Sequence, residues 1–537
     1  MKKGPLYKIE GIRLRRSEPS AGELKKAAAQ ALGLPEGAVV SCRVLRRSLD
    51  ARGRRPPLFV FNLEVETEGV PQASATEARE GVRVKRGGGD AVVPPLLTAP
   101  RRPGKVVVVG AGPAGLFAAL TLALNGIPGV LLERGRPVEE RVRDVEDFWS
   151  RGVLKGDSNV YFGEGGAGTF SDGKLTTRLR NPYSAWVKTV LVEAGAPHSI
   201  LIDAKPHIGT DRLRLLLPNL RRRLLERGWE FRFRSPMTDI IAPGGVMRGI
   251  VVGDREELEG DHVVLAVGQG AYDTYLLLHR RGVAMETKPF AVGVRVEHPQ
   301  ALIDRIQYGR WAVTPGLPPA DYALAARLGP GGRAVYSFCM CPGGFIVASA
   351  SGAGEVVTNG MSDSGRDGPW ANSALVVSVD RQDVAGERDP PLGGLFFRRR
   401  LEERAYEAAG GGYLAPAQTL KDFLAGRERA EVGYTTYRPG VRGIPLSEVL
   451  PPFVTEALRE GLKVFAGRMP GFVGEEAVLV GVETRTSAPV RILRGEDGQS
   501  VTIRGLYPCG EGAGYAGGIM SSALDGIRAA LRVMGGR

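Results

Sequence analysis

Apolar and polar residues alternate along the first part of the chain in a way that predicts a small α+β unit. Three segments have the pattern of half-buried strands: residues 7–14, 39–49 and 57–66. Between the first two, Ser20 and Glu23 form a capping-box pattern that predicts a helix over 21–32. We therefore expect a module over residues 1–69. A linker is expected over 70–104, which is rich in Gly, Pro and Arg and has little periodicity.

A long apolar run follows, because residues 106–132 contain no charged side chain. The run is long enough to cross a bilayer. However, Gly110, Gly112 and Gly115 interrupt it with the spacing G-x-G-x-x-G, directly after the apolar segment Val106–Val109. A βαβ unit buried in a parallel sheet is expected to be equally apolar. The pattern therefore predicts a strand, a glycine turn, a helix and a second strand, and no membrane span.

The glycines of this unit predict a dinucleotide site. Gly110 would make the tight turn, Gly112 would let the backbone approach a pyrophosphate, and Gly115 would let helix and strand pack closely. The first turn of the helix presents unpaired N–H groups and a partial positive charge to phosphate. Glu133 lies 18 residues after Gly115 (133 − 115), at the end of the second strand. Its carboxylate can there accept hydrogen bonds from ribose hydroxyls.

The same glycine spacing recurs at Gly163, Gly165 and Gly168, but a poor helix with a further turn glycine follows it. We interpret residues 159–175 as a backbone loop that lies against a ligand, where side chains would obstruct. Three later regions complete the pattern: a helix and strand within 208–235, a β-meander from 238 that returns to a buried strand at 263–267, and an extended segment, glycine loop and helix over 505–534.

Together these elements predict an α/β chain with a Rossmann-like FAD-binding domain, an inserted α+β substrate domain and a small N-terminal α+β module. A meander that leaves a parallel sheet and returns to it is typical of the FAD domain of flavoproteins. The expected boundaries are 1–69 for the basic module, 70–104 for the linker, 105–274 and 491–537 for the two parts of the FAD-binding domain, and 275–490 for the substrate domain.

Charge and cysteine content narrow the expected setting. The net charge is +13, and residues 1–104 carry 20 Lys/Arg against 11 Asp/Glu, which is +9 of that total. Such a module either recruits nucleic acid or simply has a solvated basic face, and we favour the second interpretation. Four cysteines are too few for a disulfide scaffold in 537 residues, and the N-terminus lacks the apolar segment of a secretory signal. We therefore expect a cytoplasmic protein.

Longer motifs extend over nearly the whole chain. They are FGEGGAGTFSDGKL (162–175), KPFAVGVRVEHPQ (288–300), YSFCMCPGG (336–344), VTNGMS (357–362), GVETRTSAPVRI (481–492) and GLYPCGEGAGYAGGIMSSA (505–523). With them the chain resembles a bacterial and plastid subfamily of FAD-dependent dehydrogenases (NAD(P)/FAD-dependent oxidoreductases) that is itself poorly defined in function. Their FAD fold is of the two-domain glutathione-reductase type. At residues 268–275, GQGAYDTY, the chain departs from relatives, which usually have His, Ser and Arg after the first glycine.

The resemblance implies FAD as the cofactor and assigns residues to it. The implied FAD contacts are Gly110, Gly112 and Gly115 at the pyrophosphate, Glu133 at the adenosine ribose, Gly165, Gly166 and Gly168 near the isoalloxazine, Gly510 and Glu511 at the ribityl or phosphate region, and Gly517, Gly518 and Ile519 at the last helix. Pro113, Ala114, Arg134 and Gly268 are further implied cofactor contacts. The positive end of the last helix would stabilise the anionic reduced flavin.

The cysteines offer candidate chemistry. Cys339 and Cys341 flank Met340 on a predicted strand, so both thiols are expected on one side. They are either a redox-active or substrate-gripping pair at the flavin, or small core residues beside it. A disulfide across C-x-C would close a strained ring. Cys509 is expected to be buried and inert. No metal site is expected, because this pair lacks a second C-x-x-C or paired histidines.

Polar side chains within the long motifs are further candidates for substrate contact. They are Asp172, Lys174, Arg295, Glu297 and His298. Of these, Lys174 and His298 join the two cysteines as candidate catalytic residues, although His298 could equally be a hydrogen-bonded structural side chain. Arg485 is either a fork for a carboxylate or phosphate, or a structural arginine that bridges domains.

The sequence thus predicts an FAD-dependent oxidoreductase that transfers hydride between flavin and a small organic substrate. NADH or NADPH, if used, would dock transiently at the flavin or be replaced by another donor, since no separate nicotinamide-binding motif is evident. Three alternatives stay open: a reductase of isoprenoid or ring double bonds, an RNA-associated flavoprotein that uses the basic module, and a non-catalytic FAD-binding partner. Neither the substrate nor the oligomeric state follows from the sequence.

Overall fold

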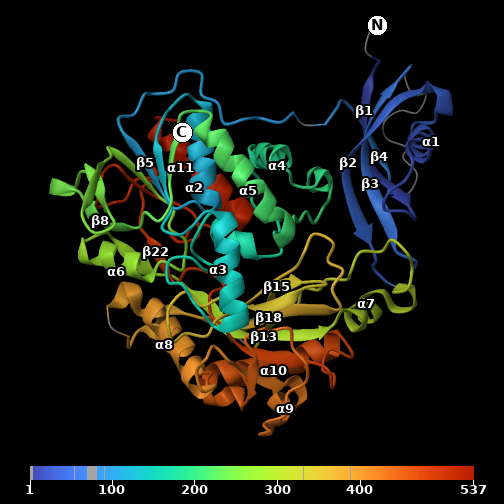
Figure 1. Cartoon of the computed structure of the whole chain (residues 1–537). Helices are drawn as coiled ribbons and strands as arrows, with labels where there is room; N and C mark the ends of the chain where they lie inside the picture. The colour runs from blue at the N-terminus through green and yellow to red at the C-terminus, as the bar shows by residue number, and fades with distance from the viewer. Residues whose placement is uncertain are drawn as a thin grey trace.

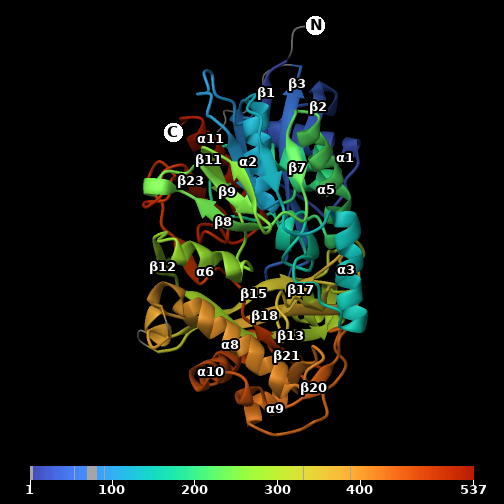
Figure 2. The same ribbon diagram turned by 60° about the vertical axis from the view of Figure 1, so that its left-hand side comes forward.

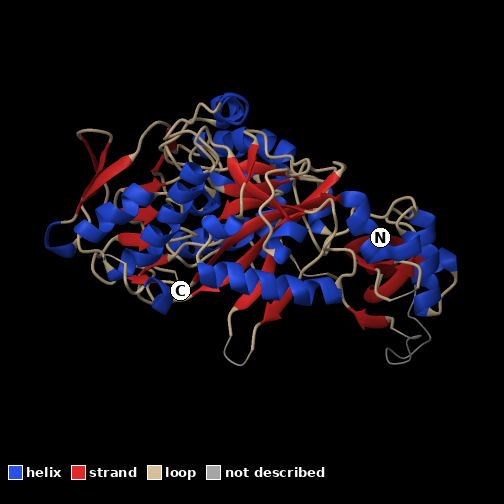
Figure 3. Cartoon of the chain, turned by 90° about the horizontal axis from the view of Figure 1, so that it is seen from below, coloured by secondary structure: helices blue, strands red, loops and turns tan. Residues whose placement is uncertain are grey.

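The chain folds into three bodies. The computed structural model describes residues 4–53, 55–68, 81–89, 91–329, 332–387 and 389–536. Figure 1 shows the N-terminal module in blue at one side, an upper body that contains a parallel sheet, and a lower body that contains a larger mixed sheet. The view from below in Figure 3 shows that the N-terminal module extends the molecule at one end.

The N-terminal module is an antiparallel sheet of order β2-β3-β1-β4, with a helix packed on one face. Its elements are β1 (Leu6–Leu14), α1 (Ala21–Leu32), β2 (Val39–Asp50), β3 (Leu58–Thr67) and β4 (Arg83–Arg86). The predicted capping box is confirmed, since Glu23 N donates to Ser20 Oγ at 3.2 Å and Ser20 N donates to the Glu23 carboxylate at 2.8 Å.

The linker prediction is wrong at one point. Strand β4 lies inside the predicted linker, but it pairs with β1 and completes the sheet of the module. The segment is short and strongly basic, so its own periodicity carries no strand signal, and the exposed edge of β1 decides its conformation. Residues 70–80 and 90 of the predicted linker, and residue 69 of the predicted module, lie outside the described residues.

The upper body is built on a parallel sheet of order β23-β11-β5-β6-β7. The strands are β5 (Val106–Val109), β6 (Val130–Leu132), β7 (Glu230–Arg232), β11 (His262–Leu265) and β23 (Leu506–Pro508). Each adjacent pair is parallel. The predicted strand, glycine turn, helix and second strand are confirmed. The strand predicted at 263–267 begins one residue earlier and ends two residues earlier.

Helices cover one face of this sheet and a β-meander covers the other. The helices are α2 (Pro113–Leu124), α4 (Ser184–Glu193), α5 (Thr210–Leu225) and α11 (Ile519–Val533). The opposite face packs against β8 (Met237–Ile241), β9 (Gly249–Val252), β10 (Glu256–Glu259) and α6 (Tyr272–Arg280). A Cβ added to Gly115 would lie 1.8 Å from Gly110 O, and one on Gly526 would lie 2.0 Å from Ala114 O. These glycines therefore allow α2 to pack closely on the glycine turn and α11 on α2.

The lower body is a mixed sheet of order β14-β15-β18-β13-β21-β19-β20. Its strands are β13 (Phe290–Pro299), β14 (Ala325–Arg327), β15 (Ala334–Cys341), β18 (Trp370–Val379), β19 (Ala415–Thr419), β20 (Val441–Gly443) and β21 (Val478–Glu483). Further elements are α7 (Gln300–Tyr308), β16 (Phe345–Ala348), β17 (Thr358–Met361), α8 (Gly393–Ala408), α9 (Leu420–Ala425) and α10 (Pro452–Arg468). Figures 1 and 2 show α8, α9 and α10 below this sheet and the parallel sheet above it.

The chain passes between the two bodies at a short antiparallel pair, β12 (Met285–Thr287) with β22 (Val490–Ile492). A second connection is α3 (Val138–Arg151), which Figure 2 shows running from the upper to the lower body. At its end Trp149 Nε1 donates to Ala348 O at 2.8 Å. Among the helices of the described residues, none has both the length and the apolar character that a membrane span requires.

Candidate functional site

A cavity of about 390 Å³ lies between the parallel sheet and the mixed sheet. Its upper part is formed by the loops that follow the carboxyl ends of β5, β6, β11 and β23, where ligands bind in open parallel sheets. Its lower part is formed by residues of the mixed sheet and its loops: Phe338, Cys339, Asn359, Glu483, Arg485 and Thr486. One cavity therefore contacts both the predicted cofactor loops and the lower body.

Two helix N-termini open onto this cavity. Gly112 is the N-cap residue of α2 and Gly518 that of α11, and neither helix has a side chain that caps its first turn. The backbone N–H groups of the first turn have no intrahelical partner and carry partial positive charge. A Cβ on Gly517 or Gly518 would meet nothing within 4 Å, and one on Gly112 would meet only Gly166 Cα at 3.9 Å. The arrangement is an anion-binding cradle that lacks side chains.

Glu133 closes the upper end of the cavity and is held by three backbone donors. Its Oε2 accepts from Ala111 N, and its Oε1 accepts from Gly135 N and Gly163 N, each at 2.9 Å. A carboxylate has about four acceptor positions, so one is left for a ligand hydroxyl. Next to it, the Arg134 guanidinium lies 4.5 Å from the centre of the Phe162 ring. This supports the predicted ribose end of the site.

The second glycine loop lies directly against the first. Gly165 N donates to Ala111 O at 2.9 Å. Gly166, Ala167 and Gly168 line the cavity, as predicted for a loop beside a ligand. Gly165 does not line it, because this glycine faces the other way, and a Cβ there would lie 2.5 Å from a Leu217 methyl group.

Arg141 of α3 holds the back of this loop. Its fully buried guanidinium donates to Asn159 O at 2.8 Å, Glu164 O at 2.6 Å and Val160 O at 2.9 Å. Burial lowers the pKa of Arg141 to about 9. The Arg141 guanidinium thus holds the loop through hydrogen bonds to its backbone carbonyl groups. Loop side chains that would fill the cavity are not needed for this.

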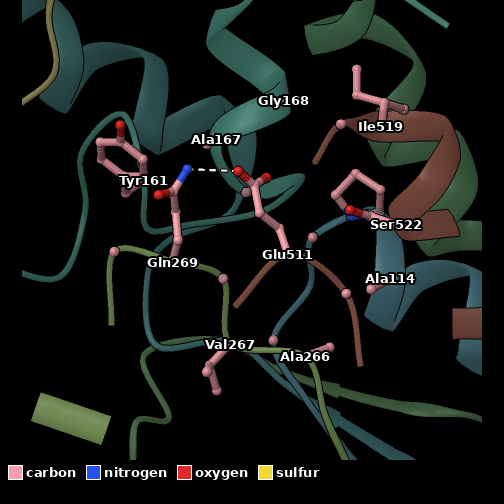
Figure 4. A pocket seen from close by; sticks show the side chains of 18 of the residues that line it. Ala114, Tyr161, Ala167, Gly168, Ala266, Val267, Gln269, Glu511, Ile519 and Ser522 are labelled. Carbon is pink, nitrogen blue, oxygen red and sulfur yellow. Dashed lines mark hydrogen bonds between the residues drawn. The ribbon is translucent and has the colours of Figure 1, made fainter. Parts of the chain in front are cut away.

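A polar network joins the loop after β11 to the loop after β23. Gln269 Nε2 donates to Glu511 Oε1 at 2.6 Å, the bond drawn in Figure 4. Arg398 Nη1 of α8 donates to Gln269 Oε1 at 3.1 Å. Burial raises the pKa of Glu511 to about 7. Figure 4 also shows Tyr161 beside this pair, and the Arg485 guanidinium lies 4.8 Å from the Tyr161 ring centre.

Arg485 is a structural arginine that joins segments of the lower body. Its Nη2 donates to Glu402 at 2.7 Å and to Glu355 at 2.9 Å, so its fork is already occupied by carboxylates. The structural interpretation drawn from the sequence therefore fits in part, because these ion pairs lie within the lower body and do not bridge domains. Glu483, two residues before Arg485 in the chain, is also buried, and burial raises the pKa of its carboxyl group to about 7. The Arg295 guanidinium, 3.1 Å from this carboxylate, opposes the shift.

The candidate catalytic residues separate into two groups. Lys174 and Cys339 line the cavity, whereas Cys341 lies behind Cys339 and is fully buried. Lys174 Nζ lies 3.1 Å from Asp172 Oδ2 and 3.8 Å from Cys341 Sγ. Asp172 also pairs with Arg366, whose Nε donates at 2.9 Å. The strand expectation for the cysteines is wrong in detail, because a bulge follows Phe338 and Cys339 has φ 47°.

His298 does not reach the cavity. The imidazole is fully buried in the lower body, where its Nε2 lies 2.8 Å from Phe472 O. Burial lowers the pKa of His298 to about 4, so the ring is neutral at physiological pH. Arg295 and Glu297 are also fully buried and outside the cavity lining. The acid–base hypothesis for His298 is therefore not supported by its position, since the alternation along β13 turns it into the core.

The predicted FAD contacts lie together around one cavity, with two exceptions. Those that line it are Gly110, Gly112, Pro113, Ala114, Glu133, Arg134, Gly166, Gly168, Gly268, Gly510, Glu511, Gly517, Gly518 and Ile519. Gly115 and Gly165 lie behind the lining. Sequence reasoning missed Tyr161, Gln269, Asn359 and Glu483 as lining residues. Gln269 directly follows a glycine at a strand end, which is the one signal that could have found it.

These features define a site for a dinucleotide. The uncapped helix ends suit a pyrophosphate, the free acceptor position of Glu133 suits a ribose, and the glycine-lined walls leave room for planar rings. The comparisons with known proteins agree. A model described as "FAD binding domain" matches residues 104–144, and one described as "FAD-dependent protein, C-terminal domain-like" matches residues 289–486. A domain of unknown function matches residues 8–66. The protein is thus a flavoprotein whose cofactor is FAD.

The family follows from a relative that spans nearly the whole chain. A protein of Clostridium beijerinckii, with the printed name "Uncharacterized protein", is 42% identical over 522 residues, which is 95% of each chain. The chain belongs to the same family of FAD-dependent proteins.

Solved structures of flavoproteins are more distant. Glycine oxidase from Bacillus cereus is 10% identical, over 80% of this chain and 95% of that chain, with a TM-score of 0.33. The flavin-dependent brominase Bmp2 is 14% identical, over 80% of this chain and 79% of that chain, with a TM-score of 0.35. Such low scores and identities say nothing about the reaction.

Proposed function

We propose that the protein is an FAD-dependent oxidoreductase that transfers hydride between its flavin and a small organic substrate. The observation that carries the proposal is that a single cavity joins the FAD loops to a polar wall of the lower body. A purely structural FAD site would have no need for reactive side chains in that wall. Here the wall contains the ammonium group of Lys174 and the thiol of Cys339.

The chain's own residues suit the binding and orientation of a substrate. When bound, FAD supplies the capacity to accept or release a hydride equivalent. Lys174 has three N–H donors. Asp172 and Cys341 occupy two of these directions, and the third is free to orient a substrate oxygen. The N-terminus of α11 places partial positive charge at the cavity, where it favours an anionic cofactor form. Phe338 and Ile519 add apolar surface that excludes water.

The proposal is tested with a visible spectrum of the purified protein, followed by anaerobic addition of NADH and NADPH. Bleaching of the flavin by either donor would support a reductase, and electron acceptors would then be screened. If neither donor acts, chemically reduced protein should be reoxidised anaerobically by a substrate from an acceptor screen. A flavin that exchanges electrons with no donor or acceptor would contradict the oxidoreductase and favour a non-catalytic FAD-binding role.

The cofactor contacts are tested with Gly112→Ala. The added methyl group would enter open space that faces the cavity, since its nearest neighbour is Gly166 Cα at 3.9 Å. We expect a folded protein that binds FAD at least about tenfold more weakly, because the methyl group blocks the approach of the pyrophosphate. Gly156→Ala is the matched control, since its Cβ would meet nothing within 4 Å. Equal FAD content in both variants would contradict the assignment of Gly112.

A further inference from the structure

Two thiols lie one residue apart at the wall of the cavity. Cys339 lines the cavity and Cys341 lies directly behind it. Cys341 Sγ lies 3.3 Å from Cys339 O, and the two side chains belong to the irregular end of β15. Cys339 adopts the left-handed conformation, with φ 47°, which is uncommon for a residue other than glycine. Residues held in such conformations cluster at functional sites.

The charges around this pair favour a thiolate. Lys174 Nζ lies 3.8 Å from Cys341 Sγ, and Arg295 Nη2 donates to Cys339 O at 2.7 Å. The neighbouring Cys341 thiol and the charges of Lys174 and Arg295 lower the pKa of Cys339 below its ordinary value. Burial and the neighbouring thiol raise the pKa of Cys341. The neighbouring cations therefore favour one negative charge on this pair of sulfur atoms.

The other two cysteines lack these features. Burial raises the pKa of Cys42, in the N-terminal module, to about 11. Burial likewise raises the pKa of Cys509. A low thiol pKa beside cations, with access to a cavity, is what distinguishes a reactive cysteine from a structural one.

The bulge in β15 between Phe338 and Cys341 also affects whether the two sulfur atoms can form a disulfide. In a regular strand the Cα atoms of residues i and i+2 lie about 6.5 Å apart, close to the upper limit for a disulfide. Regular hydrogen bonding to strands on both sides would hold the two Cα atoms at this distance. Here the register of β15 against β18 is lost between Phe338 and Cys341, so Cys339 and Met340 are not held to that ladder spacing.

We propose that Cys339 and Cys341 form a redox-active pair that exchanges two electrons with the bound FAD. In one direction the Cys339 thiolate and the Cys341 thiol join in an S–S bond. Two electrons and the proton of Cys341 pass to oxidised FAD, which becomes the reduced anion. In the other direction the S–S bond takes up the electron pair and one proton, which leaves one thiol and one thiolate near Lys174. No further reactant is needed. The inference rests on FAD binding and not on the substrate reaction proposed above.

The test is an anaerobic titration of the air-oxidised holoprotein with dithionite. We expect four electrons per chain in the wild type, two for FAD and two for the disulfide, and two electrons in Cys339→Ser and Cys341→Ser. Cys42→Ser is the matched control and should take up four. Two electrons in the wild type would overturn the proposal. Bleaching of the flavin reports the cofactor separately in every sample, so a loss of FAD is distinguished from a loss of the thiol pair.

A measurement on the unaltered protein keeps the proposal falsifiable if a variant fails to fold. Denatured wild-type protein is alkylated under acid quench before and after dithionite, and the peptide that contains both cysteines is weighed. We expect two additional alkyl groups on this peptide after reduction, and no change at Cys42 or Cys509. Full alkylation of Cys339 and Cys341 before reduction would overturn the proposal.

Discussion

Buried carboxyl groups are the most unusual feature at the scale of single residues. Burial raises the pKa of Glu164, Glu483 and Glu511 to about 7 each. Glu483 and Glu511 line the cavity, whereas Glu164, a buried residue of the second glycine loop, does not. Glu164 Oε2 accepts from Val138 N at 2.9 Å, and Oε1 has no partner among the described residues. Glu164 is thus a carboxyl whose main effect is on stability.

Glu164→Gln should therefore flatten the dependence of stability on pH. The native pKa of about 7 lies above the ordinary 4.5, so between these values the native carboxyl keeps a proton that the unfolded chain has lost. Its contribution to stability is present below pH 4.5 and is lost as the pH rises through 7. The full difference is about 3 kcal/mol, or about 3 °C in thermal midpoint for a chain of this size.

Thermal midpoints of both proteins at acid and neutral pH check this expectation. The wild type should lose more stability than Glu164→Gln on going to neutral pH. Glu226→Gln, which removes an exposed carboxyl of the upper body that pairs with Arg222, should keep the wild-type dependence. Identical pH profiles for wild type and Glu164→Gln would show that the native carboxyl titrates normally.

At the scale of elements, α3 organises the site although it contributes no lining residue. Its Arg141 binds three carbonyl oxygens of the segment 159–164, and its far end reaches the lower body through Trp149 and Ala348. A third contact is the pair of Glu146 with Arg438, at 2.5 Å. The helix therefore links the position of the second glycine loop to the position of the lower body.

Arg141→Lys should release this loop. Lysine retains the charge, but its ammonium group cannot reproduce the planar fork that reaches three carbonyl groups. Buried acceptors left without a donor cost about 1–3 kcal/mol each, so we expect a loss of about 3 kcal/mol in local stability. Limited proteolysis should cleave the variant faster within residues 156–176, and bound FAD should fall.

Arg143→Lys is the matched control for this prediction, because Arg143 is exposed on the same helix. It should resemble the wild type in both cleavage and FAD content. Unchanged cleavage of Arg141→Lys would mean that packing, and not the guanidinium, holds the loop.

At the scale of the whole molecule, the N-terminal module is attached to the upper body at one well-defined point. Arg47 forms a two-pronged ion pair with Asp203, at 2.8 and 3.1 Å. Beside it Arg47 N donates to Ile202 O at 2.7 Å and Ala204 N donates to Arg47 O at 2.8 Å. The module is therefore docked by backbone and side-chain bonds, and its sheet is not continuous with the parallel sheet.

Arg47→Ala should loosen this docking without affecting the cavity. A partly exposed ion pair contributes about 1 kcal/mol, so the bridging amide of Ala204 should exchange hydrogen about fivefold faster. Hydrogen exchange followed by mass spectrometry measures this directly, while FAD content stays constant. Arg43→Ala removes an ion pair within the module, to Glu64, and should leave the exchange of Ala204 unchanged. Equal exchange in both variants would contradict a docking role for Arg47.

Features that depend on neighbours along the chain could be predicted from the amino-acid sequence. The capping box of α1, the strand and glycine turn before α2, and Glu133 at the end of β6 were all predictable. Each depends on residues within a few turns of helix or on one βαβ unit, where spacing alone sets the geometry. The cofactor loops were predictable for the same reason.

The contacts between distant side chains in and behind the cavity wall follow from the tertiary structure alone. Lys174 and Cys341 are 167 residues apart, and Arg295 and Glu483 are 188 apart. Similarly, β4 is a strand because β1 offers it an edge, and His298 is core because β18 and β21 enclose β13. No local pattern records such contacts, since burial and pKa depend on segments that only the folded chain brings together. The proximity of Cys339 and Cys341 to Lys174 and Arg295 was therefore beyond the reach of the sequence.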